Sequence, residues 1–279
     1  MSIEHDLSNN TSGTITKRAE MCTLRHNYRR KGEHGMTGRV LILVGVMLSA
    51  AFIAGCRMKS DMNLKKVKVS ASTVYCLFDP SCAVAVTNSS TVPIPMEIMG
   101  KAVVESRTFA GKPGTPAAGL YGYEYRIDLE QGAETVVEVE EFGKVKYMPC
   151  LSSIIFDFGP IVDTLDYNGD GQTDELIYVV SQGGPGKASL GFVQRFHGRL
   201  TFNFDSPICV GGQNHPGDST FFFGLVSTKP PRLVDATIKE TAGLGAASPK
   251  MKKNIKYHVD VYAPQIDTEG SKSDRSEGL

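Results

Sequence analysis

The sequence lacks several features that would have placed it quickly in a known class. Its apolar run, from Val40 to Ala54, is shorter than the roughly 20 residues that a comfortable membrane span needs. It has no Cys-x-x-Cys pair, which excludes the usual spacings of structural zinc sites and thioredoxin-like redox motifs. A helical period is weak and confined to Leu233–Glu240, and no repeat recurs at a fixed period. These absences argue against a helical protein and against a complete propeller.

The apolar run instead fits an export signal. It follows the basic residue Arg39 and ends in Ile53-Ala54-Gly55-Cys56, where small residues precede a cysteine. This ending resembles the lipobox of bacterial lipoproteins. The resemblance implies diacylation of the Cys56 thiol, cleavage before Cys56 and acylation of the new amino terminus. In that family, Asp directly after the acylated cysteine retains a lipoprotein in the inner membrane. This chain has Arg57 there, which implies the outer membrane of a Gram-negative envelope.

Two other interpretations of this segment remain open, an uncleaved signal anchor and an ordinary signal peptide that ends near a cysteine. Residues 1–35 form a polar leader with a basic patch and are unusually long for the front of a signal. Residues 36–55 make a signal peptide of normal length by themselves, so we expect translation to begin at Met36, or at Met21.

Cleavage before Cys56 would leave 224 of the 279 residues, enough for one large β domain or two small ones. We divide them into a tether (56–66), a β domain (67–267) and a disordered tail (268–279). The first 55 residues hold seven of the 30 Lys and Arg and four of the 30 Asp and Glu, which leaves 23 basic and 26 acidic residues. That slight negative balance gives no electrostatic case for a nucleic-acid partner.

Four cysteines lie beyond Cys56: Cys76, Cys82, Cys150 and Cys209. An even number in an exported chain favours two disulfides, and three pairings are possible. We favour Cys76 with Cys82 and Cys150 with Cys209. The alternative is four buried, reduced thiols.

Runs rich in Val, Ile, Tyr, Phe and Thr follow one another, many with period-two alternation, and Gly or Pro clusters separate them. The predicted strands are Val67–Val74, Ala83–Thr87, Val92–Ile98, Ala102–Phe109, Tyr121–Leu129, Thr135–Val139, Lys144–Tyr147, Ser152–Phe158, Glu175–Ser181, Leu190–Phe196, Leu200–Phe204, Thr220–Ser227 and Tyr257–Tyr262. The expected fold is all-β, an antiparallel two-sheet, sandwich-like domain after an N-terminal lipoprotein signal.

Residues 166–174, Asp-Tyr-Asn-Gly-Asp-Gly-Gln-Thr-Asp, match the first half of an EF-hand loop, with oxygen side chains at positions 1, 3 and 5. Gly171 at position 6 permits the positive φ of a sharp turn. The twelfth position, where an EF-hand has a bidentate Glu, is Ile177, and a strand-like run replaces the second helix. The predicted calcium ligands are Asp166, Asn168, Asp170, Gln172 through its carbonyl group, and Asp174.

This loop and the strand after it resemble the calcium loops of FG-GAP and VCBS-type repeats, in which the ninth position, here Asp174, donates a carboxylate. The resemblance covers Asp166 to Val180 and implies a structural ion. Those families carry several loops per domain, whereas this chain has one. The alternative is an Asx-rich turn without metal, although three carboxylates in one turn would repel one another without a cation.

Two functions from different classes follow. The first is a non-enzymatic, membrane-anchored β domain that binds an unknown protein or glycan ligand or supports the envelope. The second is an envelope serine hydrolase, suggested by Gly217-Asp218-Ser219, which resembles the nucleophile block of GDSL-type esterases, with His215 as a base. That block lies late in the chain, and the Asp-x-x-His of the family is absent. The aromatic block Phe221 to Phe223 is expected in the core, straddling both faces of a strand, with ligand contact by one ring as the alternative.

Overall fold

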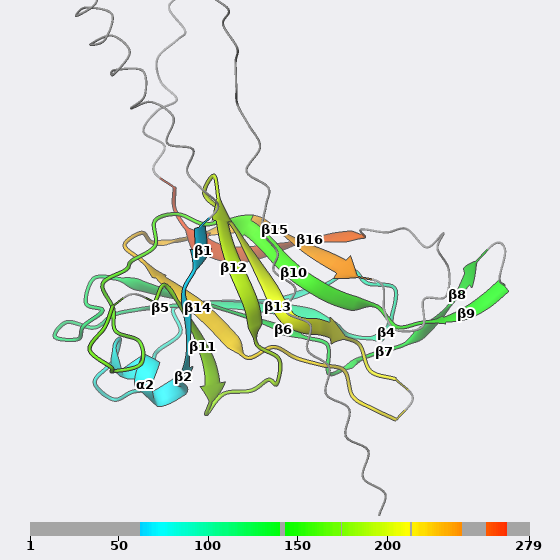
Figure 1. The fold of residues 1–279 in the computed structure, drawn as a ribbon, viewed down its shortest axis with the longest axis horizontal. Helices are drawn as coiled ribbons and strands as arrows, with labels where there is room; N and C mark the ends of the chain where they lie inside the picture. Colours follow the sequence, from blue (N-terminus) through cyan, green and yellow to red (C-terminus); the bar gives the residue numbers. More distant parts are fainter. Residues whose placement is uncertain (1–61, 140–142, 174, 213, 242–254, 267–279) are drawn as a thin grey trace, which may run out of the picture. The chain divides into compact units, whose positions relative to one another are not determined.

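The computed structural model describes residues 62–139, 143–173, 175–212, 214–241 and 255–266, and these are mostly β-strand (Figure 1). The predicted leader (1–35), signal (36–55), Cys56, the metal ligand Asp174 and the tail (268–279) lie outside the described residues. The described elements are β1 (Met62–Leu64), β2 (Lys66–Ser70), α2 (Ala71–Cys76), β3 (Asn88–Pro93), β4 (Met99–Gly100), β5 (Val103–Ala110), β6 (Tyr121–Asp128), β7 (Gly132–Ala133), β8 (Thr135–Val139), β9 (Gly143–Tyr147), β10 (Cys150–Asp157), β11 (Ile177–Gln182), β12 (Leu190–Phe196), β13 (Arg199–Cys209), β14 (Phe222–Ser227), β15 (Pro231–Thr241) and β16 (Lys256–Pro264).

The strands form two large sheets. Sheet 1 has the order β1-β12-β13-β10-β15-β16, and sheet 2 has the order β2-β11-β14-β6-β5-β3. Neighbouring strands are antiparallel, except that β2 runs parallel to β11. Two small two-stranded antiparallel sheets, β4 with β7 and β8 with β9, complete the pairing of the described strands. The predicted all-β, two-sheet fold is confirmed.

The first two described strands belong to different sheets. Strand β1 is the edge of sheet 1, and after Lys65 the chain continues as β2, the edge of sheet 2. Residues 62–66, which the sequence analysis assigned to the tether, therefore belong to the β domain. Fewer residues than expected separate Cys56 from the folded domain.

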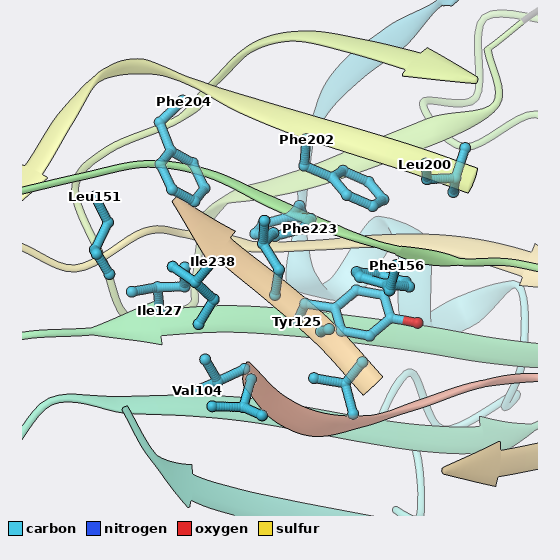
Figure 2. Close-up of a cluster of buried hydrophobic side chains, with 14 of the residues drawn as sticks. Val104, Tyr125, Ile127, Leu151, Phe156, Leu200, Phe202, Phe204, Phe223 and Ile238 are labelled. Atoms are coloured by element: carbon cyan, nitrogen blue, oxygen red, sulfur yellow. The ribbon is translucent and has the colours of Figure 1, made fainter. Parts of the chain in front are cut away.

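A main core fills the space between the sheets, as alternation along the strands requires. Figure 2 shows aromatic rings from both sheets at its centre: Phe156 and Phe202 from sheet 1, Tyr125 and Phe223 from sheet 2. The ring centroids of Tyr125 and Phe156 are 4.8 Å apart, and those of Phe202 and Phe223 are 5.1 Å apart. These rings and the surrounding aliphatic side chains bind the two sheets together.

A second, smaller core lies on the other face of sheet 2, because residues that alternate with the main core bury there too. Tyr178 belongs to it while Ile177 and Val179 belong to the main core. Likewise, Phe222 belongs to the second core and Phe223 to the main one. The expectation that the aromatic block straddles both faces of its strand is confirmed for these two rings.

Three predicted strands differ from the structure, and one of them is Val92–Ile98, where β3 covers Asn88–Pro93 instead. The strand predicted over Val67–Val74 ends at Ser70, whose hydroxyl accepts a hydrogen bond from the backbone N–H of Thr73 and caps helix α2. No strand forms over 83–87, a described segment. The weak helical period over Leu233–Glu240 belongs to β15, a strand of sheet 1.

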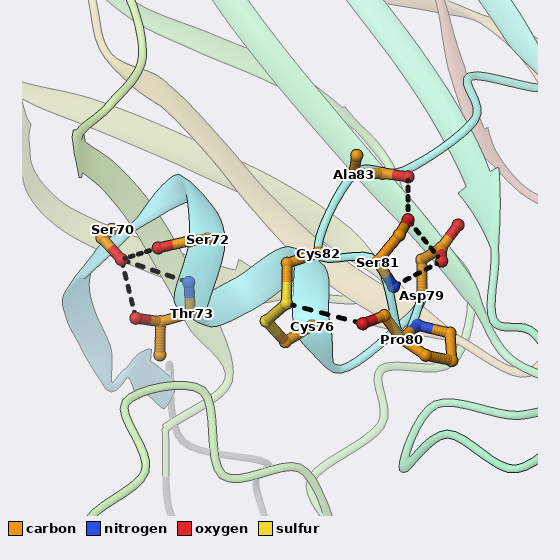
Figure 3. The surroundings of a disulfide bond; sticks show 9 residues. All are labelled: Ser70, Ser72, Thr73, Cys76, Asp79, Pro80, Ser81, Cys82 and Ala83. Atoms are coloured by element: carbon orange, nitrogen blue, oxygen red, sulfur yellow. Dashed lines mark hydrogen bonds between the residues drawn. A yellow bond between two sulfur atoms is a disulfide. The ribbon is translucent and has the colours of Figure 1, made fainter.

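Both predicted disulfides are present. Figure 3 shows Cys76, the last residue of α2, bonded to Cys82 across a short loop, in which the Asp79 carboxylate accepts hydrogen bonds from Ser81. Cys150 and Cys209 face each other in the register of β10 and β13. The first bond closes the segment that covers the second core, and the second joins two neighbouring strands of sheet 1.

Candidate functional site

The predicted metal loop connects β10 to β11, and alternating burial fixes its path. Leu165 and Tyr167 are buried in the second core, and the ring of Tyr167 lies 5.1 Å from that of Tyr178. Asp166 and Asn168, which alternate with them, remain partly exposed. Leu165 and Tyr167 thus attach the loop to the second core, and its polar side chains lie toward solvent.

Asp166 organises the turn. One carboxylate oxygen accepts hydrogen bonds from the backbone N–H groups of Gly169 (2.7 Å) and Asp170 (3.2 Å), and the other accepts from Gly171 (2.7 Å). These bonds, that from Gly171 first, lower the pKa of the Asp166 carboxyl. Gly171 has φ +84°, the left-handed conformation expected for the sixth position.

The next polar residues continue the same pattern. The side-chain oxygen of Asn168 accepts from the backbone N–H of Asp170 (2.9 Å), and one Asp170 carboxylate oxygen accepts from that of Gln172 (2.8 Å). The Asn168 amide donates to the other Asp170 oxygen (3.0 Å). The structure therefore brings together the side chains of Asp166, Asn168 and Asp170, and Gln172 joins them through its backbone N–H. Within the described ranges, no group of three or more His, Cys, Asp or Glu side chains is placed to bind a metal.

The residues present fit a calcium ion in the type of their donors. Calcium takes six to eight oxygen ligands, and a carboxylate can accept about four hydrogen bonds or metal contacts. Asp166 uses three such positions on backbone N–H groups, and Asp170 uses two, so both carboxylates retain free lone pairs. The same hydrogen bonds also make a series of Asx turns that can close without an ion.

A buried ion pair lies in the second core, which we call the Arg107 cluster: Tyr75, Arg107, Glu124 and Phe222. Glu124 is fully buried on β6, and one of its oxygens accepts from Arg107 Nε (2.7 Å) and from the Tyr75 hydroxyl (3.3 Å). The Arg107 guanidinium lies 3.9 Å from the centre of the Phe222 ring. Burial raises the pKa of the Glu124 carboxyl, and the Arg107 charge opposes that shift.

A second guanidinium, Arg126, is also buried on β6. Its side chain donates to Glu105 (2.8 Å), to Asp128 (2.8 Å) and to Glu130 (3.4 Å). The β5–β6 register places Glu105 opposite Arg126. This pair lies two residues along the strands from the facing pair of Arg107 and Glu124. Three carboxylates around one guanidinium leave an excess of negative charge beside this end of the sheet.

A cleft of about 510 Å³ opens next to that acidic excess. Glu105 and Asp128 line one part of it, and apolar side chains that include Met96, Ile98 and Val103 line another. Its size and mixed lining are within the range of sites for small ligands or for a partner's side chains. The cleft therefore offers a ligand both apolar and acidic contacts.

The residues of the hydrolase hypothesis do not present a nucleophile. Ser219 is fully buried, and its hydroxyl donates to Glu130 (2.5 Å). The Asp218 carboxylate accepts from the backbone N–H of Cys209 (3.0 Å). His215 is exposed in the loop before them. A buried serine bonded to a carboxylate has a structural explanation, and the geometry gives no support to catalysis here.

Sequence reasoning missed both guanidinium groups, the buried Arg126 and the half-buried Arg107. A signal was present, because the strands predicted over 102–109 and 121–129 carry opposite charges at alternating positions, Glu105 and Arg107 on one and Glu124 and Arg126 on the other. Pairing these strands as a hairpin would bring the charges face to face. The burial of Glu124 could not be inferred, since it depends on Tyr75 of α2, which lies far away in the sequence.

Comparisons with protein-family models, with curated proteins and with solved structures found no match to this chain. Among the described residues, no helix has the length and apolar character needed to cross a membrane.

Proposed function

We propose that this protein is an exported lipoprotein, anchored to a membrane through Cys56, whose β domain is a non-enzymatic binding or envelope-structure module stiffened by a calcium loop. Arg57 after the acylated cysteine favours the outer membrane of a Gram-negative bacterium. The proposal joins a lipid-attachment motif, a disulfide-bonded domain and a loop of calcium-binding type.

The pairing of the cysteines is the observation that carries the proposal. Disulfides persist in compartments outside the cytoplasm, and both bonds in the described domain form between cysteines of that domain. Cys56 is thus left without a disulfide partner among them. Of the six cysteines, Cys22 is the other one outside these bonds, and it lies in the leader that the proposed cleavage removes. Cys56, preceded by an export signal and small residues, has what lipid attachment requires.

The calcium ion would be held by oxygens of Asp166, Asn168, Asp170, Gln172 and Asp174. When bound, it would supply positive charge that offsets the carboxylates of one turn. Leu165 and Tyr167 fasten that turn to the second core, so stiffening it would also stiffen the surface around β11. A structural role suits a compartment in which calcium is always abundant.

Binding is supported by the cleft beside Glu105 and Asp128. It combines apolar wall, acidic edge and a size suited to part of a protein or glycan ligand. The aromatic block offers a ligand fewer accessible contacts than the cleft, because Phe222 and Phe223 are buried. An enzymatic role has no comparable support, since Ser219 is inaccessible.

Acylation at Cys56 tests the proposal. We would express the full chain in a Gram-negative host with an isotopically labelled fatty acid and measure the intact mass of the protein extracted from the membrane fraction. The expected result is a chain that begins at residue 56 and carries label, which Cys56→Ser abolishes. Cys22→Ser is the matched control and should leave the label unchanged. An unlabelled chain in the soluble fraction would refute the anchor.

A further inference from the structure

The tip of the β12–β13 hairpin has a defined and rigid geometry. Phe196 and Arg199 face each other in the register, and His197 and Gly198 connect them. Both connecting residues have positive φ, +49° and +82°. Positive φ at both central positions is the property of a type I′ turn, which matches the twist of its strands. The tip is therefore a tight turn and not a loose loop.

An aromatic side chain stands at this tip among basic ones. Phe196 is 56% exposed, and the ring of His197 meets it edge-on with 4.1 Å between ring centroids. Arg195 and Arg199 flank the turn. The half-buried Arg195 donates to the Gly159 carbonyl (3.0 Å), whereas the Arg199 side chain is 63% exposed while pairing with Asp157. Apolar or aromatic groups beside cationic side chains are what membrane interfaces select.

The tip lies beside the point where the chain enters the domain. The register of β1 and β12 places Met62 opposite Arg195, next to Phe196. Figure 1 shows the turn between β12 and β13 extending beyond the start of β1. Five residues, 57–61, separate Cys56 from Met62, and fully extended they bridge about 20 Å at most. A lipid-anchored Cys56 would thus keep the tip close to the bilayer.

We propose that the β12–β13 tip contacts the membrane surface, with the Phe196 ring inserted at the level of the lipid headgroups and the exposed Arg199 facing a phosphate. This inference rests on the proposed anchor at Cys56. It adds an orientation to the anchor: the end of sheet 1 that bears Met62 faces the bilayer. The lipid chain then holds the domain in place, while the tip fixes which face is turned outward.

The test uses the absence of tryptophan from this chain. Phe196→Trp introduces the one indole of the protein at the tip. The variant is purified with its lipid from the membrane fraction and placed in vesicles of phosphatidylethanolamine and phosphatidylglycerol, with or without brominated acyl chains. We expect a blue-shifted emission and clear quenching by the brominated lipid, because headgroup insertion removes the ring from water.

Phe192→Trp is the matched control. Phe192 lies on the same strand, is 49% exposed and is about 13 Å further from the turn. Its indole should emit as in water and resist quenching. Equal emission and equal quenching at positions 192 and 196 would overturn the proposal. The tip would then be a candidate contact for a soluble protein or glycan instead of the membrane. Circular dichroism of both variants verifies that the fold is intact.

The intact mass of the same preparation separates failure of the anchor from failure of the tip. If the mass shows no acyl group, the proposed anchor is wrong. The tip is then tested on the chain from residue 56 onward coupled through Cys56 to a maleimide lipid in the same vesicles. Acylation together with an unquenched indole at position 196 would refute the tip contact alone.

Discussion

Arg107→Met is expected to destabilise the domain by up to about 3–4 kcal/mol at pH 7. Glu124 is fully buried, and Arg107 is its cationic partner in the described structure. Removing one partner of a buried pair costs about 3–5 kcal/mol. Alternatively, Glu124 becomes protonated, and carrying a protonated glutamate at pH 7, against an ordinary pKa near 4.3, costs at most about 3.7 kcal/mol relative to the unfolded state. Because burial already raises the pKa of Glu124 in the wild type, the loss relative to the wild type lies below that limit.

The pH dependence of this loss identifies its cause. Without Arg107, burial raises the pKa of Glu124 further above its unfolded value. A raised pKa of an acid gives no penalty below the unfolded pKa and a growing one as the pH rises. The difference in the free energy of unfolding between the wild type and Arg107→Met should therefore decrease as the pH falls from 7 toward 4.5. The decrease is at most about 1.4 kcal/mol per pH unit.

Urea unfolding followed by circular dichroism at several pH values measures the free energies of unfolding. Arg199→Met is the matched control, because its pair with Asp157 is exposed on both sides and should contribute under about 1 kcal/mol. The double variant Arg107→Met with Glu124→Leu, which buries no charge, should regain most of the loss. A loss under about 1 kcal/mol for Arg107→Met, or a difference that does not decrease at low pH, would refute the reasoning.

Three further predictions concern the rest of the domain. Replacing Cys150 and Cys209 by serine should cost about 4 kcal/mol, because the bond closes a loop with a sequence separation of 59; a loss below about 1 kcal/mol in urea would contradict this. The hydrogen bond from Lys112, first among its causes, lowers the pKa of Asp79 to about 2. Asp79→Asn should therefore lower the melting temperature at pH 7, and it should lower it progressively less as the pH falls from 4 to 2. A serine-reactive phosphonate should not label the buried Ser219, and Ser219→Ala should cost about 1 kcal/mol; labelling that this variant abolishes would revive the hydrolase.

Periodicity identified most of the strands because it reports burial on one face of a sheet. The strand predicted over Leu190–Phe196 coincides with β12, and that over Thr135–Val139 coincides with β8. It failed at Val67–Val74, where β-branched residues continue past Ser70 but the Ser70 side chain caps a helix. A local hydrogen bond decided the structure there, and composition gave too weak a signal of it.

The candidate site was predictable where the chemistry is local. Within the metal loop, Gly171 adopts the expected positive φ, and the side chains of Asp166, Asn168 and Asp170 organise one turn. The Arg107 cluster was not predictable, because its burial depends on contacts between Tyr75 and Glu124, 49 residues apart. Periodicity describes one strand at a time and carries no information about what covers the sheet.

Thermal unfolding of the purified chain from residue 57 onward, in excess calcium and in chelator, tests the metal loop most directly. At 10 mM calcium, a dissociation constant of about 0.1–1 mM predicts about 1.4–2.7 kcal/mol of stabilisation. For a domain of this size that is a rise of about 3–10 °C in melting temperature. Asp170→Ala should abolish the rise, and Asp163→Ala, an exposed carboxylate of the same connection outside the loop, should preserve it. An unchanged melting temperature at millimolar calcium would contradict the proposed ion and reduce residues 166–174 to a polar turn.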